Sequence, residues 1–175
     1  MPIVKKLLKI LFFILAIILI AIFEVSFLKT LGHPFSYLQI ILTIAIFTAI
    51  FSNLGNAMWW IILGGYILDI YSPFVFGAAI LSLFFAVITV KNLAHWKIAA
   101  HNVYSLSFLS ILGTFIYNFS FFVLSNAIKI FDKSKIVYGL SAGQIFYSIL
   151  ANLILTIIFF IVAKQISKRF KTTYL

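Results

Sequence analysis

The sequence contains no cysteine, three prolines and only three acidic residues among its 175 positions. Without a thiol, the chain can form no disulfide bond, no thiolate metal site and no cysteine nucleophile. Charged residues amount to 9% of the chain, whereas a typical soluble domain has about 25%. So few charges cannot cover the surface of a water-soluble fold, and we expect an integral membrane protein.

What the chain has in abundance is apolar surface. Hydrophobic residues make up 65% of the sequence, and the mean hydropathy is +1.22. The net charge of +10 comes mostly from lysines that flank apolar segments, which is typical of cytoplasmic helix ends that touch anionic lipid. We therefore expect contact with the lipid bilayer, no nucleic-acid binding, and a single transmembrane domain over residues 1–175.

A membrane-spanning helix needs about 20 largely apolar residues. Six segments approach this length, and they predict an all-α integral membrane protein with a six-helix transmembrane bundle. The second and third segments are short, so a five-span alternative with the termini on opposite sides stays open. The six segments are roughly 7–28, 35–52, 57–72, 74–93, 103–128 and 139–163.

The distribution of basic residues predicts the orientation. With six spans and both termini in the cytoplasm, nine basic residues lie on the inner side and four on the outer side, in keeping with the positive-inside rule. The inner nine are Lys5, Lys6, Lys9, Lys91, Lys97, Lys164, Lys168, Arg169 and Lys171. The outer four are Lys29, Lys129, Lys133 and Lys135.

The most informative stretch joins the third and fourth segments. Asp69 ends the third segment, and Ser72-Pro73 follows as a turn. Serine is a favoured N-cap and proline suits the first helical position, so we predict that the fourth helix starts at Pro73. Its positive end would then help to hold Asp69 ionised. The glycines around this carboxylate allow helices to approach closely; they are Gly64, Gly65 and Gly77.

Polar residues also follow the fifth and sixth segments at steps of three or four, which places each set close to one helix face. We expect the two helices to pack through these faces; a polar cavity for a solute is the alternative. The fifth segment carries Ser107, Ser110, Thr114, Asn118 and Ser125. The sixth carries Ser141, Gln144, Ser148, Asn152 and Thr156.

The remaining titratable groups indicate no catalysis. We expect Glu24 to extend towards Lys29 at the interface. The three histidines, His33, His95 and His101, fall in or near loops without the carboxylates that a metal site would need. No P-loop, HExxH or nucleophile-elbow motif is present in the sequence, so we predict no catalytic residue, no cofactor and no metal.

The hairpin resembles the central signature of the MreD family, the rod shape-determining membrane proteins of bacteria. Members of this size typically show a G-x-x-x-D element at the end of the third helix and a glycine shortly afterwards. These positions match Gly65-Tyr-Ile-Leu-Asp69 and Gly77 here. The resemblance implies a fold similar to the substrate-capture subunits of energy-coupling-factor transporters.

The resemblance also implies a role. It suggests a non-enzymatic subunit of the cell-elongation machinery in the bacterial plasma (inner) membrane. Its expected partners are an MreC-like protein and, through it, MreB, a RodA-like polymerase and a class B penicillin-binding protein. The candidate contact or bracing residues are Gly64, Gly65, Asp69, Ser72, Pro73 and Gly77.

Two other functions stay open at this point. The chain could be a substrate-capture subunit of an energy-coupling-factor vitamin or metal transporter, with the polar fifth and sixth helices lining its pocket. An intramembrane hydrolase that uses Glu24 and Asp69 as a carboxylate pair is the third reading, although no motif surrounds either residue.

Overall fold

The computed structural model describes residues 2–33, 35–95, 103–127, 139 and 141–171. Every regular element among these residues is helical, and they contain no β-strand. In chain order the elements are α1 (Pro2–Phe23), the π-helix η1 (Glu24–Leu28), the 3₁₀ turn η2 (Phe35–Tyr37), α2 (Ile40–Phe51), α3 (Leu54–Trp59), the π-helix η3 (Trp60–Gly64), α4 (Gly65–Ile70), α5 (Ala78–His95), α6 (Val103–Ala127) and α7 (Ala142–Lys171).

Three helices are long and apolar enough to cross a membrane: Val4–Leu28, Val103–Ala127 and Ala142–Gln165. Three shorter apolar helices accompany them, at Ile40–Phe51, Leu54–Ile70 and Ala78–Ala94. Their outward side chains include many large apolar residues. This is the character of a membrane protein, because lipid and not water solvates such surfaces.

The predicted segments and the observed helices agree best at the first, fifth and sixth positions. The second segment is helical only from Ile40, after a 3₁₀ turn, and the third already begins at Leu54. The predicted start of the fourth helix at Pro73 is wrong, since α5 begins at Ala78. The predicted outer loop residues 129–137, with three of the four outer lysines, lie outside the described residues.

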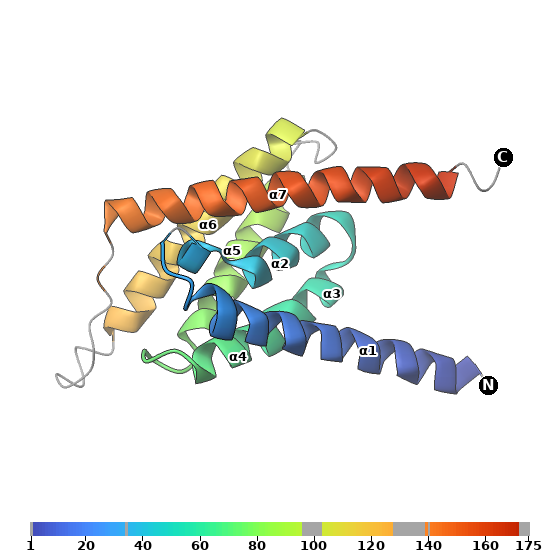
Figure 1. Ribbon diagram of the computed structural model, residues 1–175, viewed down its shortest axis with the longest axis horizontal. Helices are drawn as coiled ribbons and strands as arrows, with labels where there is room; N and C mark the ends of the chain where they lie inside the picture. The colour runs from blue at the N-terminus through green and yellow to red at the C-terminus, as the bar shows by residue number, and fades with distance from the viewer. Residues whose placement is uncertain (1, 34, 96–102, 128–138, 140, 172–175) are drawn as a thin grey trace.

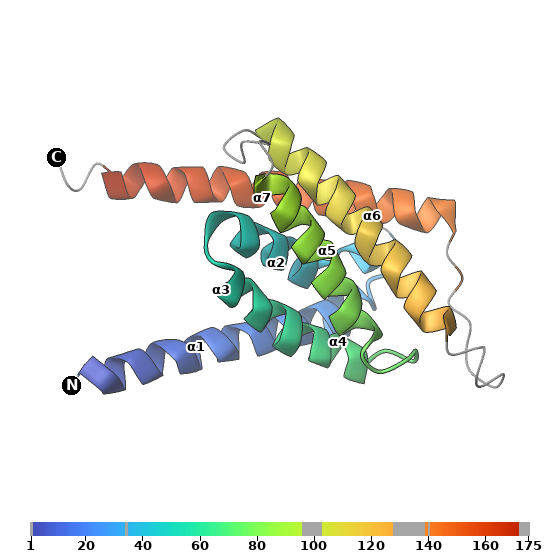
Figure 2. The ribbon, with the colours of Figure 1, turned by 180° about the vertical axis from the view of Figure 1, so that it is seen from behind.

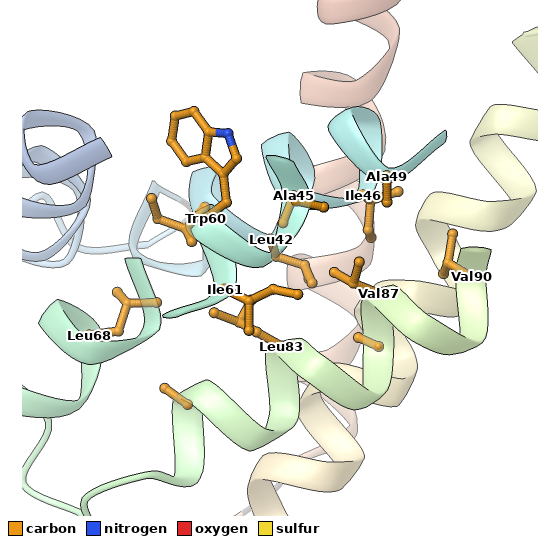
Figure 3. Close-up of a cluster of buried hydrophobic side chains, with 14 of the residues drawn as sticks. Leu42, Ala45, Ile46, Ala49, Trp60, Ile61, Leu68, Leu83, Val87 and Val90 are labelled. Carbon is orange, nitrogen blue, oxygen red and sulfur yellow. The ribbon is translucent and has the colours of Figure 1, made fainter. Parts of the chain in front are cut away.

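Helix α2 lies at the centre of the bundle. It contacts α1, α3, α5, α6 and α7, and Figure 1 shows it enclosed by them. Its buried side chains include Leu42, Ala45 and Ile46, which meet Ile61 and Leu83 from neighbouring helices in one apolar cluster (Figure 3). The short central helix is therefore covered by protein on most sides.

Two glycines of the α3–α4 run bring its backbone close to its neighbours. A Cβ at Gly64 would stand 2.7 Å from Cγ2 of Ile41 on α2. A Cβ at Gly65 would stand 3.0 Å from the Cα of Ile80 on α5. Gly65 thus allows backbone-to-backbone contact with α5, as the sequence predicted for small residues at this place.

The two ends of the molecule differ. The N-terminal end of α1 and the C-terminal end of α7 extend in the same direction, and the α4–α5 turn lies at the opposite end (Figures 1 and 2). We call the end to which α1 and α7 extend the terminal end, and the opposite end, with the α4–α5 turn, the turn end. The Ser52-Asn53 turn between α2 and α3 also faces the terminal end (Figure 1).

We predict that Gly65→Ala lowers the free energy of unfolding in detergent by about 1–3 kcal/mol, because the new methyl group would press on the Ile80 backbone. Gly55→Ala, on the same helical run, is the matched control because no atom lies within 4 Å of its added Cβ. Denaturant titration followed by circular dichroism measures both. Equal stability of the two variants would contradict the close approach.

Candidate functional site

The carboxylate of Asp69 closes the start of α5. The residue lies in α4, and its side chain is only 3% exposed. The backbone N–H of Ala79 donates to Oδ1 at 2.8 Å, and that of Ile80 donates to Oδ2 at 3.2 Å. The first N–H groups of a helix have no partner within it, so Asp69 satisfies two of them and meets the positive end of α5.

Ser72 and Pro73 serve the turn and not the helix. The predicted N-cap role of Ser72 is wrong, since its Oγ accepts the N–H of Phe74 at 3.2 Å, four residues before α5 begins. Gly77 directly precedes α5 with a φ of +94°, a conformation that favours glycine. The local Ser-Pro signal was overridden because a buried carboxylate from α4 reaches the N–H groups of the later start.

Glu24 performs the same task for α2. The expected extension towards Lys29 is wrong, because Glu24 is 2% exposed and its Oε2 accepts the N–H of Ile41 at 2.8 Å. Glu24 is the first residue of η1, and Ile41 belongs to the first turn of α2. Both acidic residues that the structure describes thus cap a helix that belongs to another segment.

The polar faces of α6 and α7 meet at this end of α2. Oδ1 of Asn152 accepts the backbone N–H of Gln39 at 2.9 Å, and its Nδ2 donates to Oε1 of Gln39 at 3.1 Å and to Oγ1 of Thr114 at 3.3 Å. Nε2 of Gln39 in turn donates to Oδ1 of Asn118 at 3.2 Å, and Nδ2 of Asn118 donates to Oγ of Ser148 at 3.2 Å. We call these five residues the polar network.

The predicted packing of the two polar faces is therefore present. Ser110 and Thr156 add a buried hydroxyl pair at 2.7 Å, nearer the terminal end. Ser141 and Gln144 stay apart from the network and form a reciprocal capping box at the start of α7, with N-to-O distances of 3.3 and 3.2 Å. Gln39 was not among the predicted site residues, since its only signal in the sequence is an amide side chain directly before the apolar run that begins at Ile40.

A cavity of about 380 Å³ opens beside the polar network at the turn end. Its polar lining includes Glu24, Lys29, Gln39, Asn118 and Ser148, and aromatic rings complete the wall. The two helices thus pack through most of these polar groups, and a space with a partly polar lining remains at one end.

The structure groups no metal ligands at this site. Among the described residues, no three histidine, aspartate or glutamate side chains come close enough to hold a metal ion. The ring of His33 packs against Tyr37 at 5.0 Å. The side chain of His95 and the whole of His101 lie outside the described residues.

Comparisons of the chain with protein-family models, with curated proteins and with solved structures gave no match. Function is therefore inferred from the residues and their geometry. That geometry is a braced hairpin (residues 64–80), in which Gly65 and Asp69 on one helix both meet the first turn of α5.

We predict that Asp69→Ala lowers the free energy of unfolding in detergent by about 1–3 kcal/mol, because it leaves buried N–H groups of α5 without an acceptor. Ser72→Ala is the control and should cost less, since it removes one acceptor in a more exposed turn. Thermal unfolding of the purified variants measures the difference. A cost for Ser72→Ala equal to that for Asp69→Ala would contradict the capping role.

Substitution of Glu24 separates hydrogen bonding from charge. We expect Glu24→Gln to stay near wild-type stability, because its amide oxygen can still accept the Ile41 N–H. Glu24→Met has a similar length but no good acceptor, and it should lose about 1–3 kcal/mol. The same unfolding assay compares them. If the Gln variant is as unstable as the Met variant, the negative charge and not the cap is what matters.

Proposed function

We propose that the chain is a non-enzymatic, multi-pass subunit of the bacterial cell-elongation machinery, as its resemblance to the MreD family implies. The observation that carries this proposal is the braced hairpin. Gly65 and Asp69, the glycine and aspartate of the G-x-x-x-D element, contact the same turn of α5, and Gly77 supplies the positive φ before it. The signature residues thus form one structural unit.

The state of the carboxylates supports a scaffold more than an enzyme. Glu24 and Asp69 are both buried, and both accept backbone N–H groups at helix starts. Carboxylates that accept backbone N–H groups at helix starts stabilise the fold, and although Glu24 also lines the cavity at the turn end, its Oε2 is engaged by the N–H of Ile41. We therefore assign them no step in a reaction.

The outward side of the hairpin and of the helical turn just before it offers a contact surface. Ile62, Tyr66 and Ile70 are about half exposed, and their spacing of four residues places them on one face. The ring of Phe76 packs edge-to-face on Tyr66 at 5.6 Å. We call these four residues the hairpin face, and we propose that a transmembrane helix of an MreC-like protein packs there.

In this proposal Asp69 is a polar anchor within the chain and does not touch the partner. It holds the start of α5 against α4, which fixes the turn that carries Phe76 relative to Ile62, Tyr66 and Ile70. Through the MreC-like protein the subunit would connect to MreB inside the cell. Through the same protein it would also connect to a RodA-like polymerase and a class B penicillin-binding protein.

Six membrane crossings with both termini in the cytoplasm fit this proposal. The ends of α1 and α7 point the same way (Figure 1), as an even number of crossings requires. Helix α2 has 12 residues, a length of about 18 Å, which is shorter than the apolar layer of about 30 Å. Its N-terminus would then lie within that layer, where unsatisfied N–H groups are costly; Glu24 and Asn152 provide the acceptors.

A cross-linked pull-down of the tagged chain from its native membrane, identified by mass spectrometry, tests the proposal. We expect to recover an MreC-like protein with a RodA-like polymerase or a penicillin-binding protein. The double variant Ile62→Ala/Tyr66→Ala should reduce this recovery several-fold, because it removes half of the hairpin face. Asp69→Ala should also reduce it, by releasing the start of α5.

The matched control is Phe115→Ala/Phe119→Ala, a stacked pair on α6 that is exposed to a similar degree. It should leave recovery unchanged at equal expression. Equal losses for the two double variants would contradict a specific hairpin contact. Recovery of none of the elongation proteins by the wild type would overturn the proposed function itself.

A second candidate function is favoured by the polar cavity at the turn end. A substrate-capture subunit of an energy-coupling-factor transporter needs a pocket for a small molecule, and Gln39, Asn118 and Ser148 offer hydrogen-bonding groups in such a space. Recovery of paired ATPases with a coupling membrane subunit in the same pull-down would favour this function over the elongation role.

A further inference from the structure

A second cavity, of about 500 Å³, lies between α1 and α3 towards the terminal end. Its walls are Lys9, Ile10, Phe13 and Ile14 of α1, and Asn56 and Trp59 of α3. We call it the α1–α3 groove. Its lining is mainly apolar, with one cation and one amide, so it combines a surface for hydrocarbon with a site for a negative group.

The groove has well-packed walls. Phe13 packs edge-to-face on the buried Trp60, with ring centroids 5.8 Å apart and planes at 88°. Nδ2 of Asn56 donates to Oγ of Ser52 at 2.9 Å, which ties the start of α3 to the preceding turn. Trp59 remains about half exposed beside these residues. A half-exposed tryptophan of this kind is typical of the membrane–water boundary.

The charge at the terminal end determines which kind of molecule the α1–α3 groove attracts. Lys5, Lys6 and Lys9 are exposed on α1, and the N-terminal part of α1 extends away from the bundle (Figures 1 and 2). The two described acidic residues, Glu24 and Asp69, are engaged at helix starts at the turn end. The groove therefore lies in a positive field without a described carboxylate beside it, which attracts anions.

We propose that the α1–α3 groove binds an anionic phospholipid. Its acyl chain lies along Ile10, Phe13 and Ile14, and its phosphate is held by Lys9 with Asn56 as a hydrogen-bond donor or acceptor to the headgroup. A zwitterionic lipid offers the same hydrocarbon but no net negative charge. This inference depends only on the chain lying in a membrane and is independent of the cell-elongation role.

Native mass spectrometry of the full chain released from detergent micelles tests the site. The probes are phosphatidylglycerol and phosphatidylcholine with identical acyl chains. We expect selective retention of phosphatidylglycerol by the wild type. Lys9→Gln should weaken that retention about fivefold, the effect of removing one lysine near a lipid phosphate. Lys29→Gln, which removes the same charge away from the groove, should leave it unchanged.

A second variant distinguishes lipid binding in the groove from attraction by the general surface charge. Ile14→Trp keeps every lysine but fills the apolar part of the groove, so it should lower retention of phosphatidylglycerol while the thermal unfolding temperature stays near that of the wild type. Equal retention of the two lipids, or no effect of Lys9→Gln, would overturn the proposal. So would a photoreactive residue at position 10 that cross-links in native membranes to a protein and to no lipid.

Discussion

The capping of α2 and α5 by carboxylates from other segments is the interaction on which the rest of the structure depends. A helix that starts inside an apolar bundle leaves its first N–H groups without water. Glu24 supplies an acceptor to Ile41, and Asp69 supplies two to Ala79 and Ile80. Because each cap lies on another segment, capping also determines which segments lie together.

The need to cap helix starts inside the bundle explains how a few polar residues can fix the arrangement of the helices. Gln39 and Asn152 extend the capping of α2 to α6 and α7, and Lys91 on α5 donates to the carbonyl of Ala49 near the other end of α2. The central helix is thus held at both ends by side chains from elsewhere in the chain. The close contacts at Gly64 and Gly65 require the neighbouring helices to be held in place, since those contacts tolerate little displacement.

The two ends of the molecule consequently have different chemistry. At the turn end the polar groups are turned inward to caps, to the polar network and to a cavity. Towards the terminal end lysines stay exposed on α1, beside an apolar groove. A protein contact at the hairpin face and a lipid contact at the α1–α3 groove would therefore occupy separate surfaces.

Much of the architecture was predictable because it depends on local pattern. Apolar length placed the long helices, and steps of three or four residues placed the polar stripes of α6 and α7 on facing sides. The close approach at Gly65 also follows from a small residue in an apolar helix. The start of α5 did not follow, because Ser72-Pro73 is a good local start signal and the actual cap comes from Asp69.

By itself the sequence determined the helical class, the membrane character and the residues able to form polar contacts inside it, since composition and periodicity are properties of short stretches. Only the tertiary structure decided which acceptor meets which donor. Glu24 had a nearby lysine as its local partner, yet it caps Ile41, 17 residues away. Gln39 bonds Asn152 across 113 residues. Such pairings depend on how the helices pack. A buried N–H without an acceptor costs more free energy than an ion pair in water gains, so Glu24 caps Ile41.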